Sequence, residues 1–119
     1  MPVIFVYGSL KKGKKLHFYL KNSVFLGVGQ TCKKYPLILS KSGWYPYLIE
    51  KEGFGFQIKG EVYKVDFKTL KKLDKVEEVP HYYYRKKIPI CLNNKKVLAY
   101  TYFVRKPPKF TKKDLLKEF

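Results

Sequence analysis

Residues 57–77 read QIKGEVYKVDFKTLKKLDKVE, and this stretch passes from the pattern of a strand to that of a helix. Up to Val65, apolar or small residues alternate with charged ones, which is typical of a strand with one buried face. Asp66 follows at the position of a helix N-cap. From Phe67 onward, apolar residues recur every three positions, which predicts a helix over 67–77. An amphipathic strand followed directly by an amphipathic helix favours a mixed α and β architecture.

The helical spacing of this segment singles out Glu77. At about 100° per residue, the apolar stripe formed by residues 67, 70, 73 and 76 covers roughly 180°, and Glu77 projects about 10° from its centre. Glu78 projects about 110° away, towards solvent. A carboxylate directed at the core is costly unless it is paired or functional, and burial raises its pKa towards the range of a general acid or base. A structural alternative is a helix-end Glu bonded to Tyr83, Arg85 or a loop amide.

The segments before and after this stretch predict mostly strands. Val3 to Tyr7 is a short apolar run that ends in a polar turn, from Tyr7 through Gly8 and Ser9 to Leu10. Such a turn after a buried strand can present backbone N–H groups to an anion, although it also serves simply to turn the chain. Ser9 lies in no G-x-S-x-G pattern, which argues against a serine hydrolase. The other expected elements are strands at 24–31, 35–39, 47–49, 82–92 and 95–104, a short helix near 16–20, and a tight turn at 93–94.

These elements together predict an α+β fold with a largely antiparallel, barrel-like sheet. A chain of 119 residues, 45% of them hydrophobic, is expected to form one domain over 1–119 with a single core. It has no apolar run of the roughly 20 residues that span a bilayer and no signal-peptide pattern, so we expect a cytoplasmic protein with no membrane partner.

The net charge of +17 raises the possibility of nucleic-acid binding. Arg85 and Arg105 are the only arginines, however, and the lysines are dispersed along the chain, which argues against that partner. Cys32 and Cys91 stand apart, and His17 and His81 lack metal-ligand spacing, so no metal site is expected.

Four motifs in this order resemble those of gamma-glutamylcyclotransferase-like proteins. They are the YGSLKKG segment at 7–13, YPL at 35–37 with PYL at 46–48, GEVYKVD at 60–66, and LDKVE at 73–77 followed by Pro80, Tyr83 and Arg85. The similarity runs from about Val3 to Val104 and is greatest to the branch of gamma-glutamylamine cyclotransferase and the AIG2-like proteins. In this chain Glu78 replaces the small residue that commonly follows the family's glutamate.

The resemblance implies a small mixed β-barrel flanked by one or two main helices. It further implies that Glu77 is the general acid/base, that Tyr7, Gly8, Ser9 and Leu10 bind the substrate, and that Tyr83 and Arg85 support Glu77. The reaction would convert a γ-glutamyl amide to 5-oxoproline and an amine, with no cofactor. The leaving amine (an amino acid, a glutathione-like peptide or an isopeptide lysine) and the oligomeric state stay open. The alternative is a non-catalytic module that binds a metabolite or nucleic acid.

Overall fold

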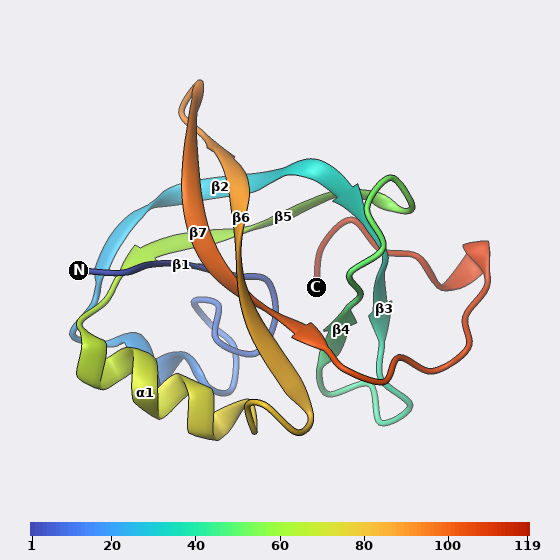
Figure 1. Ribbon diagram of the computed structural model, residues 1–119, viewed down its shortest axis with the longest axis horizontal. Helices are drawn as coiled ribbons and strands as arrows, with labels where there is room; N and C mark the ends of the chain where they lie inside the picture. The colour runs from blue at the N-terminus through green and yellow to red at the C-terminus, as the bar shows by residue number, and fades with distance from the viewer.

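The computed structural model describes residues 1–119, and its core element is a closed five-stranded barrel (Figure 1). The strands follow one another around the barrel in the order β1-β5-β2-β6-β7, and a separate two-stranded sheet is formed by β3 and β4. The neighbours pair antiparallel except β1 and β7, which pair parallel and close the barrel. The predicted α+β fold with a mixed, largely antiparallel barrel is therefore confirmed.

The elements are β1 (Val3–Val6), the 3₁₀ helix η1 (His17–Leu20), β2 (Val24–Tyr35), β3 (Leu37–Leu39), β4 (Pro46–Leu48), β5 (Phe56–Lys64), α1 (Phe67–Val76), β6 (Tyr83–Leu92), β7 (Lys95–Val104) and the 3₁₀ helix η2 (Lys112–Asp114).

The strand β1 is buried on both faces, which explains its uninterrupted apolar sequence. Ile4 and Val6 belong to one hydrophobic cluster, which also contains the α1 residues Leu70 and Leu73. Phe5, between them, belongs to a second cluster with residues of β3, β4, β5, β6 and β7. Since side chains alternate across a strand, β1 carries apolar residues in both directions and separates two hydrophobic clusters, where a single core was expected.

The helix α1 begins as the sequence predicts but buries a narrower face. The Asp66 side chain accepts a hydrogen bond from the Thr69 N–H at 2.7 Å, which confirms it as the N-cap. Leu70 and Leu73 are buried, whereas Phe67 is 68% exposed. The expected apolar stripe is therefore wrong at its first residue, because Phe67 lies in the first turn, before the helix meets the core.

The boundary between β2 and β3 also differs from the prediction. The polar residues around Cys32 were expected to separate two strands, at 24–31 and 35–39. Instead β2 continues to Tyr35, with irregularities in its pairing to β5, and the chain breaks at Pro36. A bulge accommodates the polar residues within one strand, while proline cannot donate a ladder hydrogen bond.

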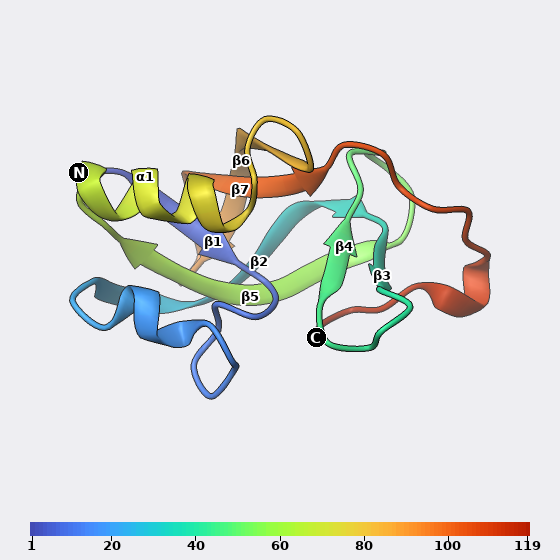
Figure 2. The same ribbon diagram turned by 90° about the horizontal axis from the view of Figure 1, so that it is seen from below.

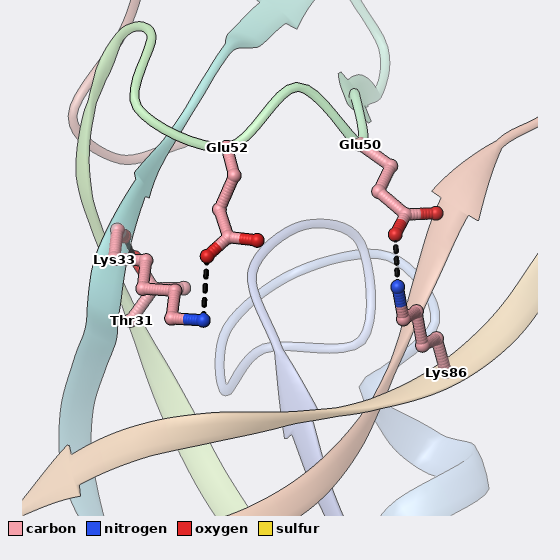
Figure 3. Close-up of polar contacts among 5 residues, drawn as sticks. All are labelled: Thr31, Lys33, Glu50, Glu52 and Lys86. Atoms are coloured by element: carbon pink, nitrogen blue, oxygen red, sulfur yellow. Dashed lines mark hydrogen bonds and ion pairs between the residues drawn. The ribbon is translucent and has the colours of Figure 1, made fainter.

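The small sheet β3–β4 lies at the end of the molecule away from the N-terminus, as both views show (Figures 1 and 2). The loop that follows β4 is tied to the barrel by two ion pairs (Figure 3). Glu52 contacts Lys33 of β2 at 2.5 Å, and Glu50 pairs with Lys86 of β6. The C-terminal segment then packs on this end, where the Leu116 N–H donates to the Leu37 carbonyl at 2.8 Å. The position of β4 beside the barrel is therefore fixed from several sides.

No helix of the chain has both the length and the apolar character that crossing a membrane requires.

Candidate active site

A cavity of about 510 Å³ lies where the turn after β1, the start of β4, the end of α1 and the start of β6 meet. Its inner wall contains buried residues, among them Tyr7, Gly8 and Tyr83. Its rim contains exposed ones, namely Lys15, Ser42, Trp44, Glu78 and Tyr82. Of the residues predicted for the site, Tyr7, Gly8, Ser9, Leu10, Glu77 and Tyr83 all line this cavity, and Arg85 does not.

Glu77 is positioned by the end of α1. It is the C-cap of the helix, and its N–H donates to the Leu73 carbonyl at 2.9 Å, so the backbone at this residue is held against the core. The Glu77 side chain makes no ion pair or hydrogen bond within the chain. Burial raises its pKa from the ordinary 4.5 to about 7. A carboxyl group with this pKa exchanges a proton easily near neutrality, which is what general acid/base catalysis requires.

The turn after β1 presents unused hydrogen-bond donors. The carbonyl of Gly8 accepts from the Lys11 N–H at 3.0 Å, and the carbonyl of Ser9 accepts from the Leu16 N–H at 2.8 Å. The N–H groups of Gly8, Ser9 and Leu10 donate to no other group of the chain. Since nearly all buried backbone N–H groups are paired in folded proteins, a run of free donors beside a cavity is suited to an anion or a carbonyl oxygen.

Gly8 is required for packing rather than for an unusual backbone angle. It is not among the glycines with positive φ. A Cβ atom at this position would lie 2.8 Å from Cδ and 2.9 Å from Cγ of Pro46, both too close for van der Waals contact. The start of β4 therefore holds the turn in place.

Two tyrosines form the inner wall of the cavity next to Glu77. The Tyr7 hydroxyl donates to the Tyr102 carbonyl at 2.6 Å, and the Tyr83 hydroxyl to the Pro46 carbonyl at 3.4 Å. Burial raises the pKa of both, and the charge of Glu77 raises them further. Both phenols therefore stay protonated near neutral pH, and each donates its proton to a backbone carbonyl. Neither is suited to act as a base.

Arg85 has a different partner from the one expected. Its Nε lies 3.0 Å from Oδ1 of Asp74, which also accepts a hydrogen bond from the Tyr102 hydroxyl at 2.8 Å. Its guanidinium also stacks on the ring of Tyr100, 4.5 Å from the centroid. Arg85 therefore does not bond to Glu77. Any support acts through Asp74, which lies in α1 one turn before the C-cap Glu77.

Sequence reasoning did not assign the aromatic residues of the cavity. Trp44, Tyr45 and Tyr82 line it, and the Tyr82 hydroxyl bonds to that of Tyr47 at 2.6 Å. The sequence did contain one indication of them. Trp44 and Tyr45 stand next to Pro46 in an expected turn, where aromatic side chains are not needed to fill a core. No cluster of three or more His, Cys, Asp or Glu side chains converges in the chain to hold a metal.

Comparisons with known proteins agree with this arrangement. The family model described as "Gamma-glutamyl cyclotransferase, AIG2-like" matches residues 4–118. A putative gamma-glutamylcyclotransferase of Methanocaldococcus jannaschii is 48% identical over 105 residues, covering 87% of this chain and 84% of that protein. The gamma-glutamylaminecyclotransferase of Homo sapiens is 37% identical over 90 residues, covering 71% of this chain and 59% of that protein. The crystal structure of an AIG2-like protein from Mus musculus superimposes with a TM-score of 0.87 at 26% identity, covering 100% of this chain and 88% of that one.

The barrel and its cavity thus define an enzyme of the gamma-glutamylcyclotransferase type. The chain belongs to the AIG2-like gamma-glutamylcyclotransferase family.

Proposed function

We propose that this enzyme cyclises a γ-glutamyl amide, releasing 5-oxoproline and a free amine, with Glu77 as the general acid/base. The observation that carries the proposal is the cavity that Glu77 shares with the free N–H groups of residues 8–10. The site thereby offers a proton acceptor with a pKa of about 7 and a set of fixed donors for negative charge. The names of the relatives support the same class of reaction.

The reaction joins two groups that the substrate already carries. The α-nitrogen attacks the γ-carbonyl carbon, the new C–N bond closes a five-membered ring, and the bond from that carbon to the leaving nitrogen breaks. The α-nitrogen must lose a proton to Glu77, and the leaving nitrogen must gain one, which Glu77 returns. Protons and electrons balance without a cofactor.

The free N–H groups of the turn bind negative charge in this scheme. The substrate offers two candidates, its α-carboxylate and the oxyanion that forms on the carbonyl oxygen during attack. Donors that are fixed before the reaction stabilise such charge without reorganisation. The enzyme then has mainly to hold the substrate bent, because nucleophile and electrophile are in one molecule.

The test is a screen of γ-glutamyl amides, with γ-glutamyl amino acids, glutathione and the isopeptide of lysine among them, for release of 5-oxoproline. We expect the enzyme to release 5-oxoproline from at least one of these amides. Binding of amides without release from any of them would favour a non-catalytic binding module instead.

A further inference from the structure

Lys11 is the charged residue that the fold leaves least exposed. Its exposed fraction is 8%, and the other polar residues that are buried to this degree, Thr31, Ser40 and Thr101, are uncharged. A lysine is seldom buried in a folded protein unless its ammonium group is paired. Lys11 directly follows Leu10 in the chain, but unlike Leu10 it does not line the cavity. Its side chain is therefore buried for contacts away from the cavity.

The contacts of the Lys11 side chain come from the C-terminal segment, residues 115–119. The Lys11 Nζ donates a hydrogen bond to the main-chain oxygen of Phe119, and it lies 3.9 Å from Oε2 of Glu118. The Lys14 Nζ lies 4.9 Å from the centroid of the Phe119 ring. In both views the C-terminus lies beside the loop that follows β1 (Figures 1 and 2). Two segments that are more than a hundred residues apart in the sequence therefore meet at Lys11.

The C-terminal segment is itself attached to the barrel and to the small sheet. The Lys59 N–H of β5 donates to the Lys117 carbonyl at 2.9 Å, and the Leu116 N–H donates to the Leu37 carbonyl of β3 at 2.8 Å. The Leu116 side chain also packs against the hydrophobic cluster that contains Leu37. The segment therefore offers the Lys11 ammonium group a partner whose position is fixed.

The backbone of Lys11 belongs to the turn that presents the free donors. Its N–H donates to the Gly8 carbonyl at 3.0 Å, which closes the turn from Gly8 to Lys11. The N–H of the next residue, Lys12, donates to Oε1 of Glu61 at 2.8 Å. Pro46, which lines the cavity, packs against Gly8. The turn is thus held beside the cavity by Pro46 and away from the cavity by the Lys11 side chain.

We propose that Lys11 is a positioning residue: it joins the turn to the C-terminal segment and thereby fixes the free N–H groups of residues 8–10 for the α-carboxylate of the substrate. This inference rests on the proposed cyclisation. Donors that are fixed in advance bind a charged group without the cost of ordering the turn. The α-carboxylate is charged before and during the reaction, so a loosened turn binds both states more weakly and the loss falls on KM.

The test compares Lys11→Met with Lys12→Met, which remove one positive charge each. Methionine keeps an apolar stem but no ammonium group, and the Lys12 side chain is exposed and forms no ion pair. We expect Lys11→Met to raise KM about tenfold and to keep kcat within about threefold of wild type. Its calorimetric affinity for 5-oxoproline, which retains the carboxylate, should fall about tenfold as well. Lys12→Met should stay within about twofold of wild type in all three quantities.

Glu118→Lys tests the same contact from an exposed position. The Glu118 side chain is 51% exposed, so the substitution changes the charge and leaves the packing intact. A second ammonium group beside that of Lys11 repels it, and KM should rise about threefold at low salt and less at high salt. In the Lys11→Met background the same substitution should have no effect, because the group that it repels is absent. Glu52→Lys, which changes the net charge equally outside the cavity, should keep the wild-type KM.

The outcomes separate this inference from the proposed reaction. A folded Lys11→Met variant with the wild-type KM, a fall in kcat alone, or an equal effect of Glu118→Lys in both backgrounds overturns the positioning role and leaves the cyclisation intact. If Lys11→Met does not fold, Glu118→Lys decides: a raised KM that salt restores supports the role, and the wild-type KM overturns it. If no amide yields 5-oxoproline, the cyclisation is overturned, and calorimetric binding of the amides then decides. Weaker binding to Lys11→Met than to Lys12→Met supports the role, and equal binding overturns it.

Discussion

Gly8 and Pro46 pack so closely that a methyl group on Gly8 would lie 2.8 Å from the Pro46 Cδ. The contact joins the turn of free N–H groups to the first residue of β4. We expect Gly8→Ala to lower kcat/KM at least about tenfold, because the turn must move away from its binding geometry, and Gly8→Val to lower it further. The double variant Gly8→Ala/Pro46→Ala should recover part of the loss, since it removes the ring that the new methyl group meets. Full activity in Gly8→Ala, or a double variant that is no better, would show that the contact does not hold the turn.

We predict that Ser9 acts in the site through its backbone N–H and not through its hydroxyl. No hydrogen bond involves the Ser9 side chain, whereas its N–H is among the free donors of the turn. Ser9→Ala should therefore keep kcat within about threefold of wild type. A complete loss of activity, with an acylated serine detected by mass spectrometry in the wild type, would point instead to a serine nucleophile.

The rate should depend on pH through Glu77. Because burial raises the pKa of Glu77 to about 7, its basic form disappears as the pH falls below neutrality. Initial rates of 5-oxoproline release, measured from about pH 5 to about pH 9, should fall by more than about tenfold per unit below about pH 7, because Glu77 and the substrate's α-amine are then both protonated. On the alkaline side the rate should continue to rise with deprotonation of the substrate's α-amine. A profile that is flat from about pH 5 to neutrality would mean that no group with this pKa acts as the base.

The same pKa shift predicts that Glu77 costs stability. The folded pKa of about 7 lies above the ordinary 4.5, so between these values the folded state binds more protons and the free energy of unfolding falls as the pH rises. Above about pH 7, the ionised Glu77 lowers the free energy of unfolding by about 3 kcal/mol in total. Glu77→Gln should therefore be more stable than wild type by about 2–3 kcal/mol at about pH 8, and the difference should vanish near pH 4. Urea unfolding at both pH values measures this, with Glu52→Gln as the exposed control. A variant less stable than wild type at the higher pH would contradict the assigned burial.

The sequence predicts those features that depend on local periodicity and capping. Asp66 at the N-cap, Asn93 and Asn94 with positive φ in the hairpin turn, and Glu77 on the inner side of α1 were all accessible in this way. The closure of the barrel by the parallel pairing of β1 with β7 depends on residues almost a hundred positions apart, and local patterns do not encode it.

The partners of the site residues were also beyond the reach of local patterns. Arg85 was expected to support Glu77, but β6 brings it to Asp74 instead. Glu78 was correctly expected to be exposed, yet helical geometry ends before it, so its place on the cavity rim follows only from the backbone turn. The role of Pro46 against Gly8 depends on the position of a separate sheet.

The most direct test of the account is the rate of 5-oxoproline release by Glu77→Gln on an amide that the wild type cleaves. Glutamine keeps the shape of the side chain but cannot accept the proton, so the rate should fall by about 10²–10⁴ while the circular dichroism spectrum stays that of the wild type. Glu52→Gln, which removes the same charge outside the cavity, should cleave the amide at the wild-type rate. A folded Glu77→Gln variant that retains the wild-type rate would contradict the assignment of Glu77 as the general acid/base.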